Sequence, residues 1–293
     1  MTAREVSLCR RCKHAVEAAL AYLFYGLFRI LPLEAASAAG GFVMRHIGPR
    51  LGVSRTARKN LDFVFPEKTR EERRVILADM WENLGRVIGE YPHLHRISGN
   101  IEIIGKDHVE KARDGGKPVI FFAGHLANWE INGVGARQMG LPLHLVYRKP
   151  NNPYVDGLLR HARASGAAGY IEKGAEGARA ILGVLKKGGA VGMLVDQKLN
   201  EGMAIPFFGR EAMTAPALAH FALKFGLPLY PVRVERMGGV KFRVTVHPTL
   251  EVVKTGDLDA DTRRILTEMN EYLEKWIRER PAQWLWTHRR WPD

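Results

Sequence analysis

Residues 118–130 read PVIFFAGHLANWE, an apolar run that leads into a turn and a histidine. The run at 118–122 predicts a buried strand, and Ala123-Gly124 predicts a turn directly after it. His125 then lies where a strand ends and a helix begins. Because α/β proteins place their chemistry at such junctions, the stretch predicts both a fold class and the position of a site.

A carboxylate, Glu130, follows His125 five residues later. A neutral imidazole accepts a proton near pH 7, and a carboxylate on its other nitrogen fixes the tautomer and raises its basicity. No Ser or Cys nucleophile of the Gly-x-Ser-x-Gly kind stands beside the pair, so the simplest chemistry is direct. His125 would deprotonate an acceptor hydroxyl, which attacks an activated acyl group. The alternative is a structural pair or a helix-start contact.

The sequence disfavours a metal site. The spacing of His125 and Glu130 is not the His-Glu-x-x-His of metalloproteases, and Cys9 and Cys12 lack a second Cys/His pair at zinc-finger spacing. With only these two cysteines, the chain does not read as a disulfide scaffold and fits a reducing compartment.

Composition and periodicity predict one α/β domain. The chain has 293 residues, 46% of them hydrophobic, and no linker or charge block divides it. We expect an N-terminal basic segment and membrane-associated helix at 1–33 and one catalytic domain at 34–293. Strands alternate with helices, which indicates a mixed, mainly parallel sheet flanked by helices. The predicted helices cover 34–48, 54–62, 69–96, the segment after Trp129, 154–164, 177–187, 215–225 and 261–280, and the predicted strands cover 101–104, 119–122, 143–147, 169–171, 190–195, 229–235 and 241–246.

The formal net charge of +13 at pH 7 suggests three kinds of partner: nucleic acid, an anionic membrane, and an acidic protein or phosphorylated substrate. Nucleic acid is the weakest, because the sequence shows no RNP box, zinc finger or basic-region heptad, and its Arg and Lys are spread along the chain. An anionic bilayer attracts such a protein by ~1 kcal/mol per well-placed cation. The alternative is that many of these charges are simply solvated surface.

A basic segment and then an apolar one open the chain. The apolar run at 15–28 has 14 residues and contains Glu17, whereas a confident membrane-spanning helix needs ~20. A signal peptide is disfavoured, because no small-residue cleavage site follows the run and basic residues flank both ends. One helical face is apolar, which predicts a helix lying at a membrane interface or, alternatively, packed on the protein's own core. That face carries Leu20, Leu23, Phe24, Leu27 and Leu31.

The stretch at 124–130, GHLANWE, is similar to the histidine-x4-acid box of the lysophospholipid and glycerol-phosphate acyltransferase superfamily, in the Glu form of the bacterial lipid A late acyltransferases. Further blocks resemble that family in the same order and cover most of the chain from about residue 15 to its end. They are NLDFVFPE at 60–67, YRKPNN at 147–152, DQ at 196–197, IPFFGREAMT at 205–214 and PAQWLWTHRRW at 281–291.

The resemblance implies a glycerol-3-phosphate acyltransferase-like fold and an acyltransferase of lipopolysaccharide biosynthesis. The donor would be acyl carrier protein, with coenzyme A as the alternative, and the acceptor a hydroxyl on an acyl chain of a lipid A precursor. His125 would be the base and Glu130 would orient it. Because the thioester carries the activation, we expect neither a metal nor a cofactor. The first helix would hold the enzyme at the cytoplasmic face of the inner membrane, as a single-pass or a peripheral protein.

Five more residues are predicted to bind substrate. Arg148 follows a predicted strand, and its guanidinium suits a phosphate or a developing oxyanion, unless it pairs with Asp156 as a loop brace. The following helix brings Arg160 toward the cleft, whereas a solvated face is the simpler interpretation for Arg163. Asn128, inside the box, is also assigned to substrate binding.

Asp196 and Thr214 complete that set. Asp196 ends a buried strand near the box, where it would hydrogen-bond the acceptor or orient an arginine, or only cap a loop. Thr214 is predicted as the N-cap of a helix with Pro216 in its first turn, and amides there bind anions. Phe207 and Phe208 would line an acyl slot or pack in the core.

The C-terminal tail mixes three tryptophans with basic side chains. Such a belt suits a lipid–water interface, and packing beneath the active site is the alternative. We do not expect His288 to be catalytic.

Two departures from the family pattern affect the predicted acyl length and acceptor. The chain stops at Asp293 without a longer basic extension, and Asp196-Gln197 replaces an acid-histidine pair. The alternatives are acylation of another glycolipid, such as a phosphatidylinositol mannoside, or of a lysophospholipid, and a non-catalytic lipid-binding protein at a membrane surface.

Overall fold

The structure, a computed structural model, describes residues 3–164 and 166–292, with side chains from residue 11 onward. A seven-stranded sheet with the order β1-β9-β8-β2-β5-β3-β4 forms its centre. Neighbouring strands are parallel except for β8 and β9, which are antiparallel. The strands are β1 Ile101–Ile104, β2 Val119–Ala123, β3 Leu143–Tyr147, β4 Gly169–Glu172, β5 Ala190–Leu194, β8 Leu229–Gly238 and β9 Lys241–Val246. This confirms the predicted mixed, mainly parallel sheet.

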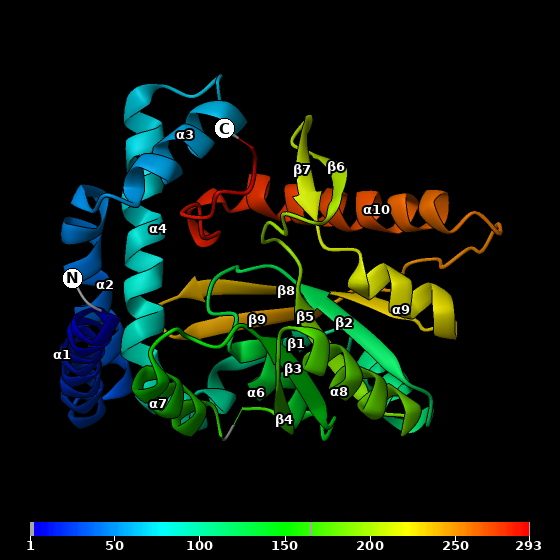
Figure 1. Cartoon of the computed structure of the whole chain (residues 1–293), viewed down its shortest axis with the longest axis horizontal. Coiled ribbons are helices and arrows are strands. Elements are labelled where there is room, and N and C mark those ends of the chain that lie inside the picture. The colour runs from blue at the N-terminus through cyan, green and yellow to red at the C-terminus, as the bar shows by residue number, and fades with distance from the viewer. Residues whose placement is uncertain (1–2, 165, 293) are drawn as a thin grey trace.

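Helices cover both faces of the sheet, and β2 shows why its sequence is apolar throughout. Phe121 packs into a core with α5 Lys106–Asp114 and α6 Ile131–Gln138. Phe122 points to the opposite face, into a core with α8 Ala175–Lys186, α9 Ala217–Phe225 and α10 Leu258–Glu279. Since alternate residues of a strand face opposite sides, a strand covered on both sides needs apolar residues at every position. Figure 1 shows α10 crossing one side of the sheet.

The N-terminal part consists of helices beside the sheet. They are α1 Ala3–Ile30, α2 Leu33–Ile47, η1 Gly48–Arg50, α3 Ser54–Val64, α4 Arg70–Glu90 and η2 Tyr91–Asn100. Helices α2 and α4 lie side by side (Figure 1), and α1 contacts η2 and α7 Pro153–Arg163. No helix among the described residues is long and apolar enough to cross a membrane.

The C-terminal tail is part of the core. After α10, the chain passes through η3 Pro281–Gln283 and places three tryptophans between α3, α4, α10 and the hairpin of β6 Met203–Phe207 and β7 Arg210–Thr214. Trp284 and Trp286 are fully buried and Trp291 nearly so. The prediction of a tryptophan belt at a lipid–water interface is therefore wrong, and the packing alternative is confirmed.

The predicted elements lie where expected to within a few residues, with two omissions. Helix α5 has only Val109 and Ala112 as buried residues, so its sequence carries no apolar stripe. The β6–β7 hairpin was predicted as a turn-bracketed aromatic segment with no strands. The predicted helix at 69–96 stops at Glu90 and continues as η2, which begins at the residue before Pro92.

Candidate active site

Three strands end at one edge of the sheet and bring the site together. His125 follows β2 and Asp196 follows β5, and these strands are parallel neighbours, with Ala123 opposite Leu194. β3, on the other side of β5, ends at Tyr147 and leads to Arg148. Side chains that are far apart in sequence therefore meet at the carboxyl ends of the strands, where ligands of parallel sheets bind.

A buried carboxylate holds His125. Asp196 has no exposed surface, and its Oδ1 lies 2.7 Å from Nδ1 of His125. The Oδ2 atom accepts hydrogen bonds from the backbone N–H of His125 and the indole N–H of Trp284, both at 2.8 Å. Burial alone would raise the pKa of Asp196, but the interaction with His125 outweighs it and holds that pKa well below its usual range. The ionised carboxylate only accepts, so Nδ1 carries the hydrogen and Nε2 presents its lone pair.

The loop that carries His125 is held by the C-terminal tail. The N–H of Ala127 donates to the carbonyl of Gln283 at 2.8 Å, and the N–H of Leu285 donates to the carbonyl of His125 at 3.2 Å. Ala127 has φ 49°, a left-handed conformation that non-glycine residues adopt at a cost of about 1–2 kcal/mol. At Gly124 a Cβ would lie 2.8 Å from Leu273. The packing therefore fixes the loop in a conformation that is unfavourable by itself.

Gln197 and His288 lie next to Nε2 of His125, the ring nitrogen that does not face Asp196. The amide Nε2 of Gln197 is 3.3 Å from Nε2 of His125 and 3.3 Å from Nε2 of His288. The two imidazole rings are 5.2 Å apart between centroids. Burial, together with the electrostatic interaction with His125, lowers the pKa of His288 to about 4. His288 is therefore neutral near pH 7.

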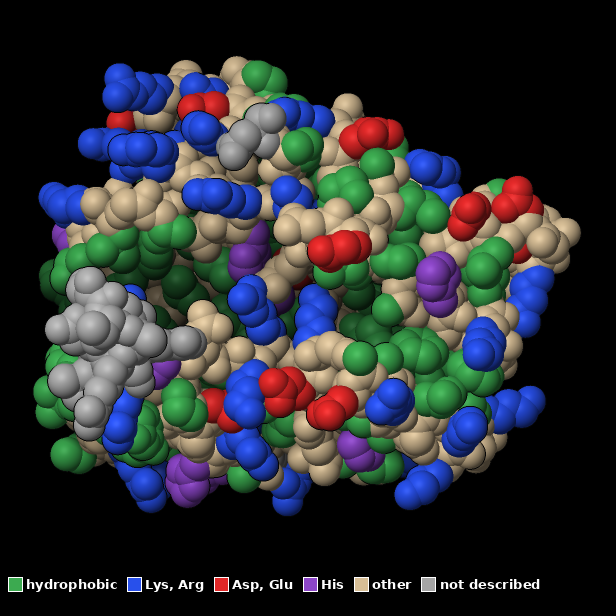
Figure 2. Space-filling view, in the orientation of Figure 1, with side chains coloured by type: hydrophobic (Ala, Val, Ile, Leu, Met, Phe, Trp, Pro, Cys, Tyr) green, Lys and Arg blue, Asp and Glu red, His purple; other side chains and the backbone are tan. Residues whose placement is uncertain are grey.

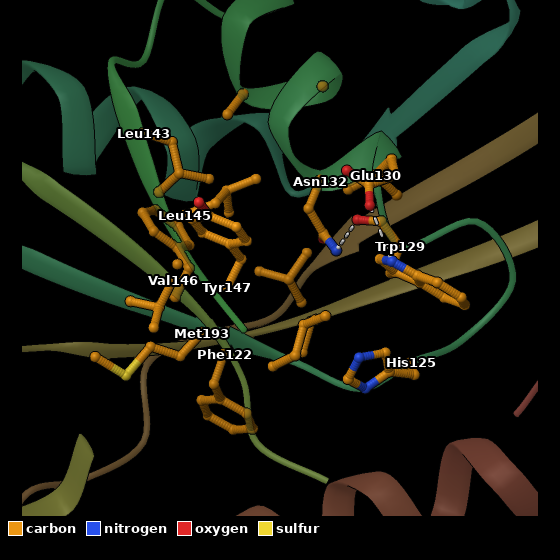
Figure 3. A pocket seen from close by; sticks show the side chains of 18 of the residues that line it. Phe122, His125, Trp129, Glu130, Asn132, Leu143, Leu145, Val146, Tyr147 and Met193 are labelled. Atoms are coloured by element: carbon orange, nitrogen blue, oxygen red, sulfur yellow. Dashed lines mark hydrogen bonds between the residues drawn. The ribbon is translucent and has the colours of Figure 1, made fainter. Parts of the chain in front are cut away.

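Glu130 belongs to a second buried cluster. Arg163 donates two hydrogen bonds to its carboxylate, at 2.9 and 2.6 Å, and Tyr91 donates a third at 2.7 Å. The indole N–H of Trp129 also donates to Glu130, at 3.1 Å, and the Trp129 ring contacts His125 with centroids 5.1 Å apart. Figure 3 shows the indole near both His125 and Glu130. Trp129 therefore connects the two residues.

A cavity of about 440 Å³ begins at these residues and continues into the protein. Its polar end is lined by members of both clusters and by Tyr147, Arg148 and Lys173. The members that line it are His125, Gln197, His288, Trp129, Glu130 and Arg163. Its other end is apolar and lies within the core between the sheet and helices α5 and α6, lined by Ile103, Val109, Met139, Leu141, Leu143, Val232 and Val244. Figure 2 shows a hollow in the visible face of the molecule, with hydrophobic side chains along its left wall. Among the described residues, no three His, Cys, Asp or Glu side chains are placed to hold a metal ion.

A histidine paired with a buried carboxylate thus stands at the head of a cavity with an apolar far end. The family model described as bacterial lipid A biosynthesis acyltransferase matches residues 10–293. The chain belongs to this family. The resemblance noted from its motifs is thereby confirmed, and the protein is an acyltransferase.

Relatives of this acyltransferase are named as enzymes of lipid A biosynthesis. The lipid A biosynthesis palmitoleoyltransferase of Escherichia coli (strain K12) is 30% identical, over 80% of this chain and 77% of the relative. The lipid A biosynthesis acyltransferase of Haemophilus influenzae is 26% identical, over 91% of this chain and 85% of the relative. Among solved structures, the 1-acyl-sn-glycerophosphate (LPA) acyltransferase of Thermotoga maritima aligns with a TM-score of 0.39 at 13% identity, covering 93% of this chain and 99% of that one.

The carboxylate partner of His125 in this acyltransferase differs from the predicted one. Nδ1 of His125 faces Asp196, while the carboxylate of Glu130 binds Arg163, Tyr91 and Trp129. The prediction that Glu130 contacts the imidazole directly is therefore wrong. The physical reason is that residue 130 follows the turn at 127 and is the N-cap of α6, where its side chain binds Arg163 and Tyr91 and not Nδ1. None of the roles predicted for Asp196 included pairing with His125.

The positions of Arg160 and Arg163 in α7 are the reverse of those predicted. Arg163, expected on a solvated face, lines the cavity and binds Glu130. Arg160, expected in the cleft, is exposed and is not among the residues that line the cavity. Arg148 lines the cavity as expected. Asp156, its alternative partner, instead accepts a hydrogen bond from Tyr147 at 3.4 Å.

Asn128 and Thr214 lie outside the cavity lining. Asn128 is fully buried and donates to Glu90 at 2.8 Å. Thr214 ends β7 and accepts a hydrogen bond from Arg290 at 2.8 Å. The N-cap position of α9 belongs to Pro216, so the predicted capping role of Thr214 is wrong. The strand pairing of β7 with β6 extends to Thr214, which excludes it from the following helix.

Three residues of the site were not predicted from the sequence: Arg163 and Gln197, which line the polar end, and Tyr91, which binds Glu130 behind it. For Gln197 a signal existed, because it stands directly after Asp196 at the end of a predicted strand. Tyr91 had none, since it lies in a segment predicted as the end of a long helix.

Proposed function

We propose that the protein transfers a fatty acyl chain from the thioester of acyl carrier protein to a hydroxyl group of a lipid A precursor. One observation carries this proposal above the others. The imidazole of His125, oriented through Nδ1 by Asp196, lies at the head of a cavity whose far end is apolar. This arrangement suits a base that works where an acyl chain is held. The names of the relatives support the choice of lipid A as the acceptor.

The proposed reaction needs only proton transfer and positioning. Nε2 of His125 takes the proton of the acceptor hydroxyl while the oxygen attacks the thioester carbon. The tetrahedral intermediate then collapses, the carbon–sulfur bond breaks, and the leaving thiolate takes the proton from His125. Asp196 stays ionised throughout and stabilises the imidazolium that forms between the two steps.

Glu130 has an indirect role in this scheme. It fixes Arg163, whose guanidinium lines the cavity, and accepts a hydrogen bond from Trp129, which packs against His125. We assign Glu130 to positioning, through these two side chains. A bidentate arginine–carboxylate pair suits this task, because its geometry is fixed in two directions.

The cavity mouth carries positive charge suited to the proposed substrates. Arg148 and Lys173 line it. Two exposed lysines, Lys149 and Lys198, directly follow the lining residues Arg148 and Gln197 in sequence. A guanidinium binds phosphate through parallel hydrogen bonds. We assign Arg148 to a phosphate of the acceptor, and the basic surroundings to attraction of an acidic carrier protein.

We also place the enzyme at the cytoplasmic face of the inner membrane. The apolar side chains predicted on the face of α1 remain exposed, as do several on α2 and after it, and no part of the described protein covers them. They are Leu20, Leu23, Phe24, Leu27, Ile30, Phe42, Val43, Ile47, Leu51 and Val53. Figure 2 shows hydrophobic side chains along the left edge of the molecule, with Lys and Arg gathered above them. An apolar surface bordered by cations matches the interface of an anionic bilayer.

A transfer assay tests the proposal. Purified protein is incubated with a labelled acyl thioester of acyl carrier protein and a lipid A precursor, and the labelled lipid is quantified. We expect His125→Ala to lose at least ~10²-fold in rate, because general-base catalysis contributes about that much. The matched control is His161→Ala, which removes an exposed histidine of α7 outside the cavity lining.

Undiminished transfer by the His125 variant would reject the mechanism. Transfer to a lysophospholipid in preference to the lipid A precursor would reject the acceptor. If the wild-type protein binds lipid and transfers nothing, the non-catalytic alternative replaces both.

A further inference from the structure

Three backbone N–H groups next to the imidazole of His125, those of residues 125–127, already donate hydrogen bonds within the protein. Acyl transfer passes through an oxyanion, which enzymes stabilise with N–H groups aimed at its position. Here the N–H groups of His125, Leu126 and Ala127 are already bound, to Asp196, the carbonyl of Gly124 and the carbonyl of Gln283 respectively. None of these three is available to the oxyanion, so a side chain that lines the cavity is the candidate donor.

Most neutral side-chain donors that line the cavity are also engaged. Trp129 donates to Glu130, Asn132 donates to the carbonyl of Trp129, and Tyr170 donates to the carbonyl of Arg163. Tyr147 donates to Asp156. Gln197 differs from these, because its amide faces the lone pair of His125 at 3.3 Å, and that lone pair is the one the acceptor hydroxyl needs.

We propose that the side-chain amide of Gln197 is the oxyanion donor of this enzyme, and that His288 holds the amide in position. The inference rests on the proposed function and adds a catalytic residue to it. An amide NH₂ has two hydrogens. One contacts Nε2 of His288 and the other contacts Nε2 of His125, the atom at which the proposed reaction takes place.

The step proceeds by exchange of partners at Nε2 of His125. The acceptor hydroxyl displaces the Gln197 hydrogen from that lone pair and gives its proton to His125. As the new carbon–oxygen bond forms, the electron pair of the thioester carbonyl moves onto its oxygen. The released Gln197 hydrogen then binds that oxygen until the carbon–sulfur bond breaks. Both contacts of the Gln197 amide, at 3.3 Å, are longer than a usual N–H hydrogen bond and therefore weak. Little free energy is lost when the acceptor hydroxyl replaces the amide at Nε2 of His125.

His288 is suited to the anchoring role because it stays uncharged. It lies against Gln197 inside the protein, and its Nε2 accepts from the amide only while that nitrogen carries no proton. A neutral ring also avoids repulsion with the imidazolium that His125 becomes. His288, which was not expected to be catalytic from the sequence, thus has a positioning role.

The test separates turnover from substrate binding. Gln197→Met keeps the length of the side chain and removes both donors. We expect kcat to fall about 10²–10³-fold with the KM for the acceptor nearly unchanged, as for the loss of a donor used only in the transition state. His288→Leu removes the anchor and should lower kcat about 10-fold, whereas His288→Gln, which retains an acceptor, should recover most of that loss. Arg148→Met serves as the contrast, since loss of a phosphate contact should raise KM.

Three results would overturn the inference while folding, followed by thermal unfolding, is retained. They are a Gln197→Met kcat within about threefold of wild type, a loss confined to KM, and a gain in rate, which would mean that Gln197 only blocks the base. Hydrolysis of the thioester by water gives a readout independent of the lipid, because it forms the same oxyanion. A wild-type enzyme that hydrolyses the thioester but acylates no lipid would contradict the proposed acceptor and still test Gln197. If the wild type does neither, both proposals are rejected.

Discussion

At the scale of single residues, two carboxylates near His125 differ in what they touch. Asp196 binds the imidazole and the backbone of the same residue, whereas Glu130 reaches His125 only through Trp129. A carboxylate on Nδ1 decides which nitrogen carries the proton, and an amide in its place allows the wrong tautomer. Under the proposed mechanism, the two carboxylates should therefore have separable effects on the reaction.

We predict that Asp196→Asn lowers kcat by about 10²–10⁴-fold, since the tautomer of His125 is no longer fixed. Glu130→Gln should lower it by only about 10-fold, because its effect passes through neighbouring side chains. Steady-state transfer rates for the two variants check this, with circular dichroism to confirm that both fold. Equal losses, or a larger loss for Glu130→Gln, would contradict the indirect role and indicate that Glu130 acts directly on His125, as its spacing predicted.

The stability of the protein should depend on pH through His288. Its pKa is about 4 in the folded protein and about 6.5 when unfolded. Between these values the unfolded chain binds a proton that the folded protein does not. The free energy of unfolding therefore falls as the pH drops from about 6.5 to about 4, by roughly 1–3 kcal/mol from this residue.

Urea unfolding at pH 7.5 and pH 4.5 measures this dependence. His288→Asn should lose less stability than the wild type between the two pH values, whereas His161→Asn, at an exposed position, should behave like the wild type. An unchanged pH dependence in the His288 variant would show that burial of this ring does not control the proton uptake.

His125 was predictable from the sequence and its partner was not. The apolar run before His125 and the turn after it locate a strand end, which is a local property. The pairing of His125 with Asp196 spans 71 residues and follows from the neighbouring positions of β2 and β5 in the sheet. Strand order is set by packing of the whole domain and cannot be predicted from one segment. The local spacing of five residues therefore predicted Glu130, and not Asp196, as the partner of His125.

At the scale of elements, α2 and α4 pack so closely that their glycines are needed. A Cβ on Gly85 would lie 2.2 Å from the carbonyl oxygen of Gly40, and a Cβ on Gly40 would lie 2.3 Å from that of Gly85. Backbone atoms on both sides prevent relief by side-chain movement. The close contact fixes α4, whose last residue, Glu90, lies beside the box.

We predict that Gly85→Ala destabilises the protein by about 1–3 kcal/mol or more, since the added methyl group forces the two helices apart. Gly183→Ala is the matched control, because Gly183 lies in α8 with nothing within 4 Å of the added Cβ. Alanine there should stabilise by about 0.4–1 kcal/mol. The midpoints of thermal unfolding of both variants check the prediction, and an unchanged midpoint for Gly85→Ala would contradict the close packing.

Elements with a strong apolar pattern were predictable, and those without one were not. β2 and β5 are apolar at nearly every position, and α10 carries an apolar stripe, so their existence follows from sequence. The β6–β7 hairpin contains Pro206 and turns at Phe208, which has φ 54°. A left-handed conformation at a phenylalanine cannot be predicted from the residue type. Tertiary contacts with α10 hold that hairpin in place.

At the scale of the whole molecule, one buried carboxylate joins the N-terminal helices to the catalytic sheet. Glu90, without exposed surface, accepts hydrogen bonds from Ser37 of α2 at 2.7 Å, from Asn128 of the box at 2.8 Å, and from Arg236 of β8 at 2.5 Å. Buried charges of this kind persist only when fully paired. The helices that carry the exposed apolar surface are thus rigidly connected to the loop that carries His125.

This connection leads to a prediction about membrane binding. Phe42 and Ile47 are 67% and 51% exposed on α2, and transfer of each into a bilayer interface is worth roughly 1.5–3 kcal/mol. We expect Phe42→Asp combined with Ile47→Asp to weaken binding to vesicles of anionic lipid by at least ~10²-fold. Leu258→Asp, which changes an equally exposed leucine (56%) at the start of α10, is the control, since Figure 1 places that end of the molecule opposite α1 and α2. Vesicle co-sedimentation measures both variants.

Binding of the wild type should also fall at high salt, because cations beside the apolar surface contribute to it. Retention of full binding by the double variant would remove α2 from the membrane contact, and equal weakening by Leu258→Asp would show that any exposed apolar residue suffices.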